Sequence, residues 1–219
     1  MTRVKICGLT RDSDLETAVE AEADAVGFVC DVPVETPRQV SVDRAAALLE
    51  ATPPFVTSVL VTMPADPERA IQLVDQLEPD AVQIHGGLSA GDLAYVRANV
   101  DARLLYAVDA VDPTSASTYD ELVDGLVVDT VDEDGGGGTG ETHDWERTKR
   151  AVTELDSPVI LAGGLTPMNV ADAIRTVEPF AVDVSSGVES VGGRKDEDAV
   201  RSFVRRATAA GRSIEPNHH

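Results

Sequence analysis

Residues 3–10 read Arg-Val-Lys-Ile-Cys-Gly-Leu-Thr, a short apolar run that predicts a buried strand ending at Cys7. The turn that follows holds Gly8 alone, not the Gly-x-Gly-x-x-Gly of an open dinucleotide-binding sheet. Lys5 lies two residues before Cys7, so both side chains point to the same face of the strand. A nearby ammonium favours a thiolate, which makes Cys7 a candidate reactive group. The alternative is a small buried apolar residue, the commoner role of a free cysteine.

Similar apolar, β-rich runs recur along the chain at fairly even spacing. Eight strands are expected, at 4–7, 25–29, 57–61, 81–84, 103–108, 125–128, 159–161 and 181–184. Helical stretches are expected between them and after the last, at 12–23, 41–51, 67–77, 89–100, 145–155, 169–177 and 196–210. This alternation predicts an α/β protein with parallel strands and crossover helices. Eight units favour a single (β/α)8 TIM barrel over residues 1–212, with a short or degenerate fifth helix at 114–120 and a short tail at 213–219.

Length and composition restrict the class of protein further. The chain has 219 residues, which suits one large domain. No run of eighteen apolar residues appears, and the N-terminus enters a strand at once, so neither a membrane span nor a signal peptide is expected. Two cysteines, Cys7 and Cys30, are no disulfide framework. A cytoplasmic protein with no membrane partner is therefore expected.

Charge is the most unusual feature of the composition. The formal net charge is −21, and the lysines are Lys5, Lys149 and Lys195 alone. Such a chain repels phosphate backbones, so nucleic acid is excluded as an expected partner. A pervasively acidic, lysine-poor surface indicates a halophilic protein; the alternative is an ordinary acidic enzyme.

Active sites of (β/α)8 barrels lie at the carboxyl ends of the strands. Residues at or just after the expected strands are therefore the candidates: Cys7, Gln83, His85, Asp129, Gly163, Gly164, Ser185, Ser186 and Gly187. The glycines and serines follow the seventh and eighth strands, where barrels often bind phosphate through backbone amides. Taken separately, each of these two segments is also compatible with an ordinary turn.

Three further residues admit two interpretations each. Asp129 is expected across the barrel mouth from Cys7, where an acid opposite a base suits proton transfer; a helix cap or a partner for an arginine is the alternative. Arg38, after the second strand, suits carboxylate binding or an internal ion pair. His85 suits catalysis or packing. The glycine-rich segment 134–140 suits a loop closing over a ligand, or a simple connector.

These residues together resemble phosphoribosylanthranilate isomerase, from the first strand to the last helix. The motifs that carry the resemblance are Val-Lys-Ile-Cys-Gly-Leu-Thr at 4–10, Ala-Asp-Ala-Val-Gly-Phe at 23–28, Pro-Arg at 37–38, Ala-Val-Gln-Ile-His-Gly at 81–86, Val-Asp-Thr at 128–130, Gly-Gly-Thr-Gly at 137–140, Leu-Ala-Gly-Gly-Leu-Thr-Pro-Met-Asn-Val at 161–170, Phe-Ala-Val-Asp-Val-Ser-Ser-Gly-Val-Glu at 180–189 and Gly-Arg-Lys-Asp at 193–196.

The resemblance implies an Amadori rearrangement of a phosphoribosyl anthranilate in tryptophan biosynthesis, without cofactor or metal. It implies Cys7 as general base, Asp129 as general acid, Arg38 on the anthranilate carboxylate and the two late loops on the phosphate. The expected substrate-binding set is Lys5, Arg38, Gln83, His85, Gly163, Gly164, Asp183, Ser185, Ser186 and Gly187. The expected partner is a small phosphosugar, and the chain a monomer or homodimer.

Rival interpretations remain open on the sequence. A sister phosphosugar barrel, such as the histidine-pathway isomerase or indole-glycerol-phosphate synthase, relies on paired aspartates or on lysine and glutamate, which fit this chain less well. A thiol-dependent hydrolase needs a histidine paired with Cys7, for which His85 is the candidate. A non-catalytic phosphosugar binder would bind the ligand without turnover.

Overall fold

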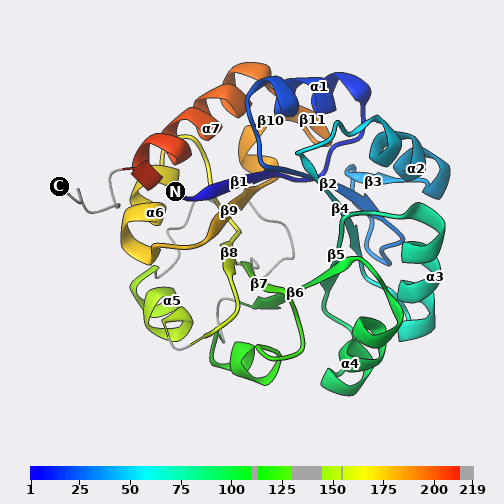
Figure 1. Ribbon diagram of the computed structural model, residues 1–219. Coiled ribbons are helices and arrows are strands. Elements are labelled where there is room, and N and C mark those ends of the chain that lie inside the picture. Colours follow the sequence, from blue (N-terminus) through cyan, green and yellow to red (C-terminus); the bar gives the residue numbers. More distant parts are fainter. Residues whose placement is uncertain (110–112, 130–144, 154, 213–219) are drawn as a thin grey trace.

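The computed structural model describes residues 1–109, 113–129, 145–153 and 155–212. Eight parallel strands form a closed barrel, because β1 pairs with β9 on one side and with β2 on the other. Figure 1 looks into this ring, with the helices around it. The barrel strands are β1 (Arg3–Ile6), β2 (Ala25–Cys30), β4 (Thr57–Thr62), β5 (Ala81–His85), β6 (Arg103–Asp109), β7 (Gly125–Asp129), β8 (Val159–Leu161) and β9 (Ala181–Val184).

Helices form the outer layer of the barrel (Figure 1). They are α1 (Asp12–Glu20), α2 (Val42–Ala51), α3 (Pro67–Leu77), α4 (Ala90–Asn99), α5 (Trp145–Val152), α6 (Val170–Val177) and α7 (Glu197–Arg212). Local sequence sets several of their starts: the side chains of Ser41, Asp66 and Ser89 each accept a hydrogen bond from a backbone N–H of the first turn. The short fifth crossover is the 3-10 helix η1 (Pro113–Thr118), which confirms the predicted degeneracy of that helix.

Three short strands and one short helix were not expected from the sequence. The strand β3 (Gln39–Val40) extends the sheet beside the end of β2, and β10 (Glu189–Val191) pairs with β11 (Arg194–Lys195) as a hairpin after β9. The 3-10 helix η2 (Ser186–Val188) precedes that hairpin. These elements contain no apolar run of the kind that marks the equally short β8, so the sequence pattern does not predict them.

Alternation along each strand divides the apolar residues between two compartments. The larger lies between strands and helices and includes Phe28, Leu60 and Phe203, all fully buried. Burying a side chain of this size stabilises the fold by about 1.5–3 kcal/mol. The smaller compartment fills the barrel interior with such side chains as Val59 and Val127. Polar residues that point inward must therefore find partners in this narrow interior.

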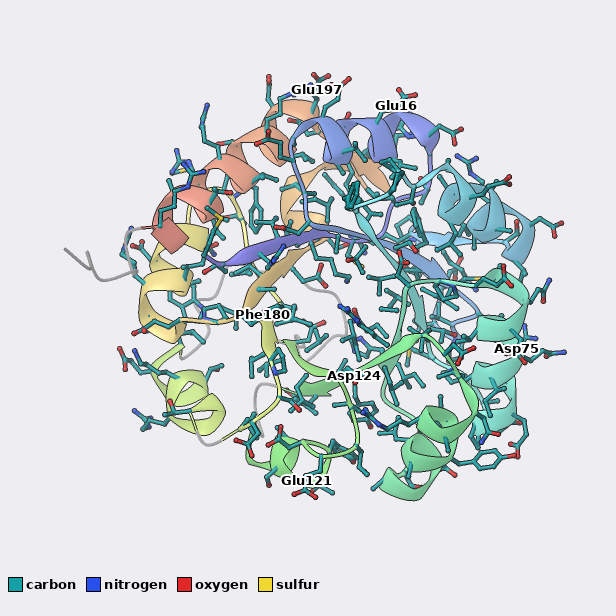
Figure 2. All side chains as sticks on the ribbon, in the orientation of Figure 1. Glu16, Asp75, Glu121, Asp124, Phe180 and Glu197 are labelled. Carbon is teal, nitrogen blue, oxygen red and sulfur yellow. The ribbon has the colours of Figure 1, made fainter. Side chains whose placement is uncertain are left out.

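Acidic side chains cover the outside of the barrel. Figure 2 shows Glu16, Asp75, Glu121 and Glu197 on its outer ring, and all four are exposed. No helix in the described ranges is long and apolar enough to cross a membrane.

The acidic surface predicts a strong dependence of stability on salt. The net charge of −21 repels itself in dilute buffer, and the screening length falls from about 10 Å at 0.1 M salt to about 3 Å at 1 M. We expect the melting temperature to rise steadily from roughly 0.1 to 2 M KCl. Calorimetry across this series is the measurement. A melting temperature that stays flat would contradict the prediction.

Candidate active site

Cys7 lies directly after β1 at the carboxyl end of the barrel, and its backbone N–H donates to the carbonyl of Val184 at 2.8 Å. The residue is 7% exposed. Gly27, on the neighbouring strand β2, makes room for it, since a Cβ atom there would lie 2.8 Å from Cys7 Sγ. The thiol therefore occupies a tight space at the top of the barrel interior.

Burial raises the pKa of the Cys7 thiol, although the positive charges of Lys5 and Lys195 act to lower it. The sequence predicted that Lys5 would favour the thiolate. The charge of Lys5 does favour the thiolate, but the expected net lowering of the Cys7 pKa was wrong. Loss of solvation in the barrel outweighs the effect of the Lys5 ammonium, which is itself shared with the Asp183 carboxylate. Without a ligand, the protein thus holds Cys7 mainly as a thiol at neutral pH.

Lys5 anchors a buried polar network below Cys7. Its Nζ donates to Gln83 Oε1 at 3.0 Å and to Asp183 Oδ2 at 2.8 Å, and all three residues are buried. Burial disfavours the ammonium, but Asp183 and Cys7 outweigh it and raise the pKa of Lys5. The Oδ1 atom of Asp183 is buried with no hydrogen-bond partner among the described residues. An acceptor in that position suits a ligand hydroxyl.

His85 is the last residue of β5 and is half-buried. Burial and the charge of Lys5 lower the pKa of the imidazole, against the opposite effect of Asp183. His85 is therefore neutral at pH 7 and offers both a donor and an acceptor nitrogen. The residues beneath the mouth thus include an ammonium, a carboxylate, an amide and a neutral imidazole.

Asp129 ends β7 and is partly exposed. It shares the inward face of that strand with Val127, two residues earlier, which packs inside the barrel. In the register of the sheet it lies opposite Asp109, the last residue of β6. The fold therefore places the Asp129 carboxylate at the same end of the barrel as Cys7, on a strand three positions away around the ring.

The loops after β8 and β9 contact each other through their backbones. A Cβ on Gly187 would lie 1.9 Å from the carbonyl oxygen of Leu165, so only glycine permits this approach. Gly163 and Gly164 both have positive φ angles, 80° and 61°. Ser185 Oγ donates to the carbonyl of Cys7 at 3.2 Å, which joins this region to the thiol. Ser186 and Gly187 begin η2. Clustered backbone amides of this kind suit an anion such as phosphate.

Arg38 makes an internal ion pair, the alternative that the sequence left open. Its Nε and Nη2 donate to Glu189 Oε1 and Oε2 at 2.9 and 2.8 Å. Glu189 also accepts from Lys195 Nζ at 2.9 Å, and Lys195 donates to the carbonyl of Ser185 at 3.1 Å. Sequence reasoning missed Glu189 and Lys195 as site residues. The available signal was the scarcity of lysine, because Lys195 is one of only three.

Other sequence predictions fall outside this cluster. Cys30 was expected just past the second strand, but it is the last residue of β2 and points into the outer core, 1% exposed. Trp145 packs against the outer core. The segment 134–140 lies outside the described residues. A cleft of about 610 Å³ beside the mouth, lined by Asp31, Met63, Arg69 and neighbouring residues, was not predicted.

The fold and the site together define a class: a (β/α)8 barrel whose carboxyl end carries an acid, a thiol and two loops with backbone amides that suit an anion. The model of the N-(5'-phosphoribosyl)anthranilate isomerase family matches residues 4–206. The chain belongs to this family.

Individual relatives agree with the family match. The chain is 61% identical to N-(5'-phosphoribosyl)anthranilate isomerase of Halobacterium salinarum over 95% of its length and 97% of that protein. It is 54% identical to that of Haloarcula marismortui, over 96% of this chain and 98% of that one. These relatives come from halophilic archaea and confirm the halophilic character predicted from charge.

Solved structures of the family have the same fold. A phosphoribosyl anthranilate isomerase from Thermotoga maritima superposes with a TM-score of 0.86 at 36% identity, over 95% of this chain and all of that one. A second structure, in complex with reduced 1-(o-carboxyphenylamino)-1-deoxyribulose 5-phosphate, gives a TM-score of 0.82 at 34% identity, over the same shares. The predicted (β/α)8 barrel is thereby confirmed.

Proposed function

We propose that this protein converts N-(5-phospho-β-D-ribosyl)anthranilate to 1-(2-carboxyphenylamino)-1-deoxy-D-ribulose 5-phosphate in tryptophan biosynthesis. The observation that carries the proposal is the placement of Cys7 and Asp129 at the carboxyl end of a barrel of this family. The reaction moves hydrogen within one molecule, oxidising C2′ and reducing C1′, and therefore consumes no cofactor.

Asp129 acts first, as the general acid. Its carboxyl proton passes to the ring oxygen of the ribose, the bond between that oxygen and C1′ breaks, and the anilino nitrogen lone pair forms the C1′=N bond of an iminium ion. The position of Asp129 at the open end of β7 supports this role, because a ring oxygen can reach a carboxyl at the mouth.

Cys7 acts second, as the general base. The thiolate takes the proton from C2′, and the electrons of that C–H bond form C1′=C2′ while the C=N electrons return to nitrogen. The resulting enolamine loses its O2′ proton, gains one at C1′ and becomes the ketone. A thiolate that loses solvation is a stronger base, so the burial that raises the pKa of Cys7 also increases its basicity once it is ionised.

Binding is assigned to the remaining residues of the site. The backbone around Gly163, Gly164 and Ser185–Gly187 would hold the phosphate. Arg38 would hold the anthranilate carboxylate. Lys5, Gln83 and Asp183, with His85 nearby, would contact the ribosyl hydroxyls, and Asp183 Oδ1 would be the open acceptor.

Two further assignments concern the cellular location and the oligomeric state of the protein. We propose a cytoplasmic location, supported by its biosynthetic class and by two free thiols. The proposed state is a monomer or homodimer.

The direct test mixes the protein with freshly made phosphoribosyl anthranilate and follows the decay of its anthranilate-type fluorescence. We expect decay much faster than without protein, with the ketose phosphate as product. A parallel assay with the histidine-pathway aminoaldose phosphate tests the sister activity. Binding without fluorescence decay would support a phosphosugar binder and refute the proposal.

A further inference from the structure

Glu189 accepts hydrogen bonds from three residues on two segments of the barrel mouth. Its carboxylate accepts from Arg38 Nε and Nη2, from Lys195 Nζ at 2.9 Å and from the backbone N–H of Gly193 at 3.2 Å. The side chain is only 5% exposed. A carboxylate with this many donors is held in one orientation, and it also fixes the orientation of the side chains that donate to it.

The contacts join the segment after β2 to the hairpin after β9. Arg38 precedes β3, whereas Glu189 and Lys195 lie on the paired strands β10 and β11. The hairpin turn packs directly on the first segment, since a Cβ on Gly193 would lie 2.3 Å from the carbonyl oxygen of Pro37. Thr10 Oγ1 fixes the same turn by donating to the carbonyl of Gly193 at 2.8 Å.

Charge and exposure distinguish the two cations that share Glu189. Arg38 and Lys195 carry two positive charges against one carboxylate, so the group keeps one net positive charge. The Lys195 side chain is 1% exposed and the Arg38 side chain 26%. The excess charge is therefore presented to a ligand through Arg38. Neither of its bonds to Glu189 uses Nη1, and a guanidinium offers five N–H donors in a planar fork.

The pKa of Glu189 is shifted in the direction expected for a carboxylate held between two cations. Burial opposes the carboxylate, but hydrogen bonds and charge from Arg38 and Lys195 overcome that effect and lower its pKa.

We infer that Glu189 is a positioning residue that sets the specificity for a substrate carboxylate. It fixes the Arg38 fork toward the mouth before substrate arrives, so that Nη1 and the second Nη2 hydrogen can bind the carboxylate. Because the side chain is ordered in advance, binding costs less conformational entropy. The inference rests on the proposed assignment of Arg38 to the anthranilate carboxylate.

The test compares two ligands by calorimetry: reduced 1-(o-carboxyphenylamino)-1-deoxyribulose 5-phosphate and its phenylamino counterpart without the carboxyl group. We expect Glu189→Gln to weaken binding of the carboxylated ligand by roughly 10- to 100-fold, as for loss of a charge-assisted contact. Binding of the counterpart should change by less than about threefold, as for an uninvolved contact. The KM of the substrate should rise more than kcat falls.

Control variants separate positioning from general damage. Glu197→Gln, which removes an exposed carboxylate paired with Arg201 on α7, should leave both affinities unchanged. Arg38→Ala should lose the preference for the carboxylated ligand, and Arg38→Ala combined with Glu189→Gln should lose no more. Glu189→Asp keeps the charge, should restore part of the preference, and serves if Glu189→Gln does not fold by circular dichroism.

The outcomes distinguish the two proposals. If Arg38→Ala keeps the preference, the assignment of Arg38 in the proposed function fails. If Arg38→Ala loses it while a folded Glu189→Gln keeps it, only the role of Glu189 is refuted. Equal weakening of both ligands by Glu189→Gln would indicate a purely structural residue and would also overturn the inference.

Discussion

Replacing Cys7 with alanine is expected to lower kcat by about 10²–10⁴-fold, the usual contribution of a positioned general base. The barrel should stay folded, because alanine fits the space beside Gly27 without a clash. Stopped-flow fluorescence with phosphoribosyl anthranilate gives kcat, and circular dichroism checks the fold. Near-normal turnover in this variant would rule out Cys7 as the base.

Cys30 provides the matched control for Cys7. It is a buried free thiol on the outer face of β2, away from the barrel interior. Cys30→Ser should retain turnover, and a thiol reagent should inactivate that variant as it does wild type, with protection by substrate. Inactivation that persists in Cys7→Ser and vanishes in Cys30→Ser would reverse the assignment.

The pH profile follows from the same thiol. Only the thiolate accepts a proton, and burial raises the pKa of Cys7 above the ordinary thiol value. The value of kcat/KM should therefore increase with pH through the neutral range, with its inflection above that of a free cysteine. An inflection below that of a free cysteine would mean that Lys5 and Lys195 prevail over burial.

Replacing Asp129 with asparagine is expected to reduce kcat by a similar factor of about 10²–10⁴, because the amide cannot donate an acidic proton to the ring oxygen. Asparagine preserves the size of the side chain at the end of β7, so stability should change little. The same fluorescence assay measures the loss.

Asp109 is the informative comparison, since it ends the neighbouring strand opposite Asp129. We expect Asp109→Asn to retain most of the activity. If Asp109→Asn is the variant that loses turnover and Asp129→Asn is not, the acid assignment belongs to the neighbouring carboxylate.

The sequence could predict which functional residues lie together at the strand ends, because that placement depends only on the order of residues along the chain. Alternation places Lys5 and Cys7 on one face of their strand, and barrel topology places the strand ends, including His85 and Asp129, at one mouth. The protonation of Cys7 was predicted in the wrong direction. Its pKa depends on how far water is excluded, which no local pattern reports.

Contacts between distant segments were decided by tertiary structure. Arg38 and Glu189 are separated by 151 residues, and Lys5 and Asp183 by 178. Neither pair has a spacing that a local rule can recognise. The sequence alone determined the alternation of strands and helices and hence the barrel, because periodic burial is a local property of the chain. Only the closure of the barrel, which pairs β1 with β2 and with β9, brought the segment after β2 beside the hairpin after β9, so that Arg38 and Lys195 share Glu189.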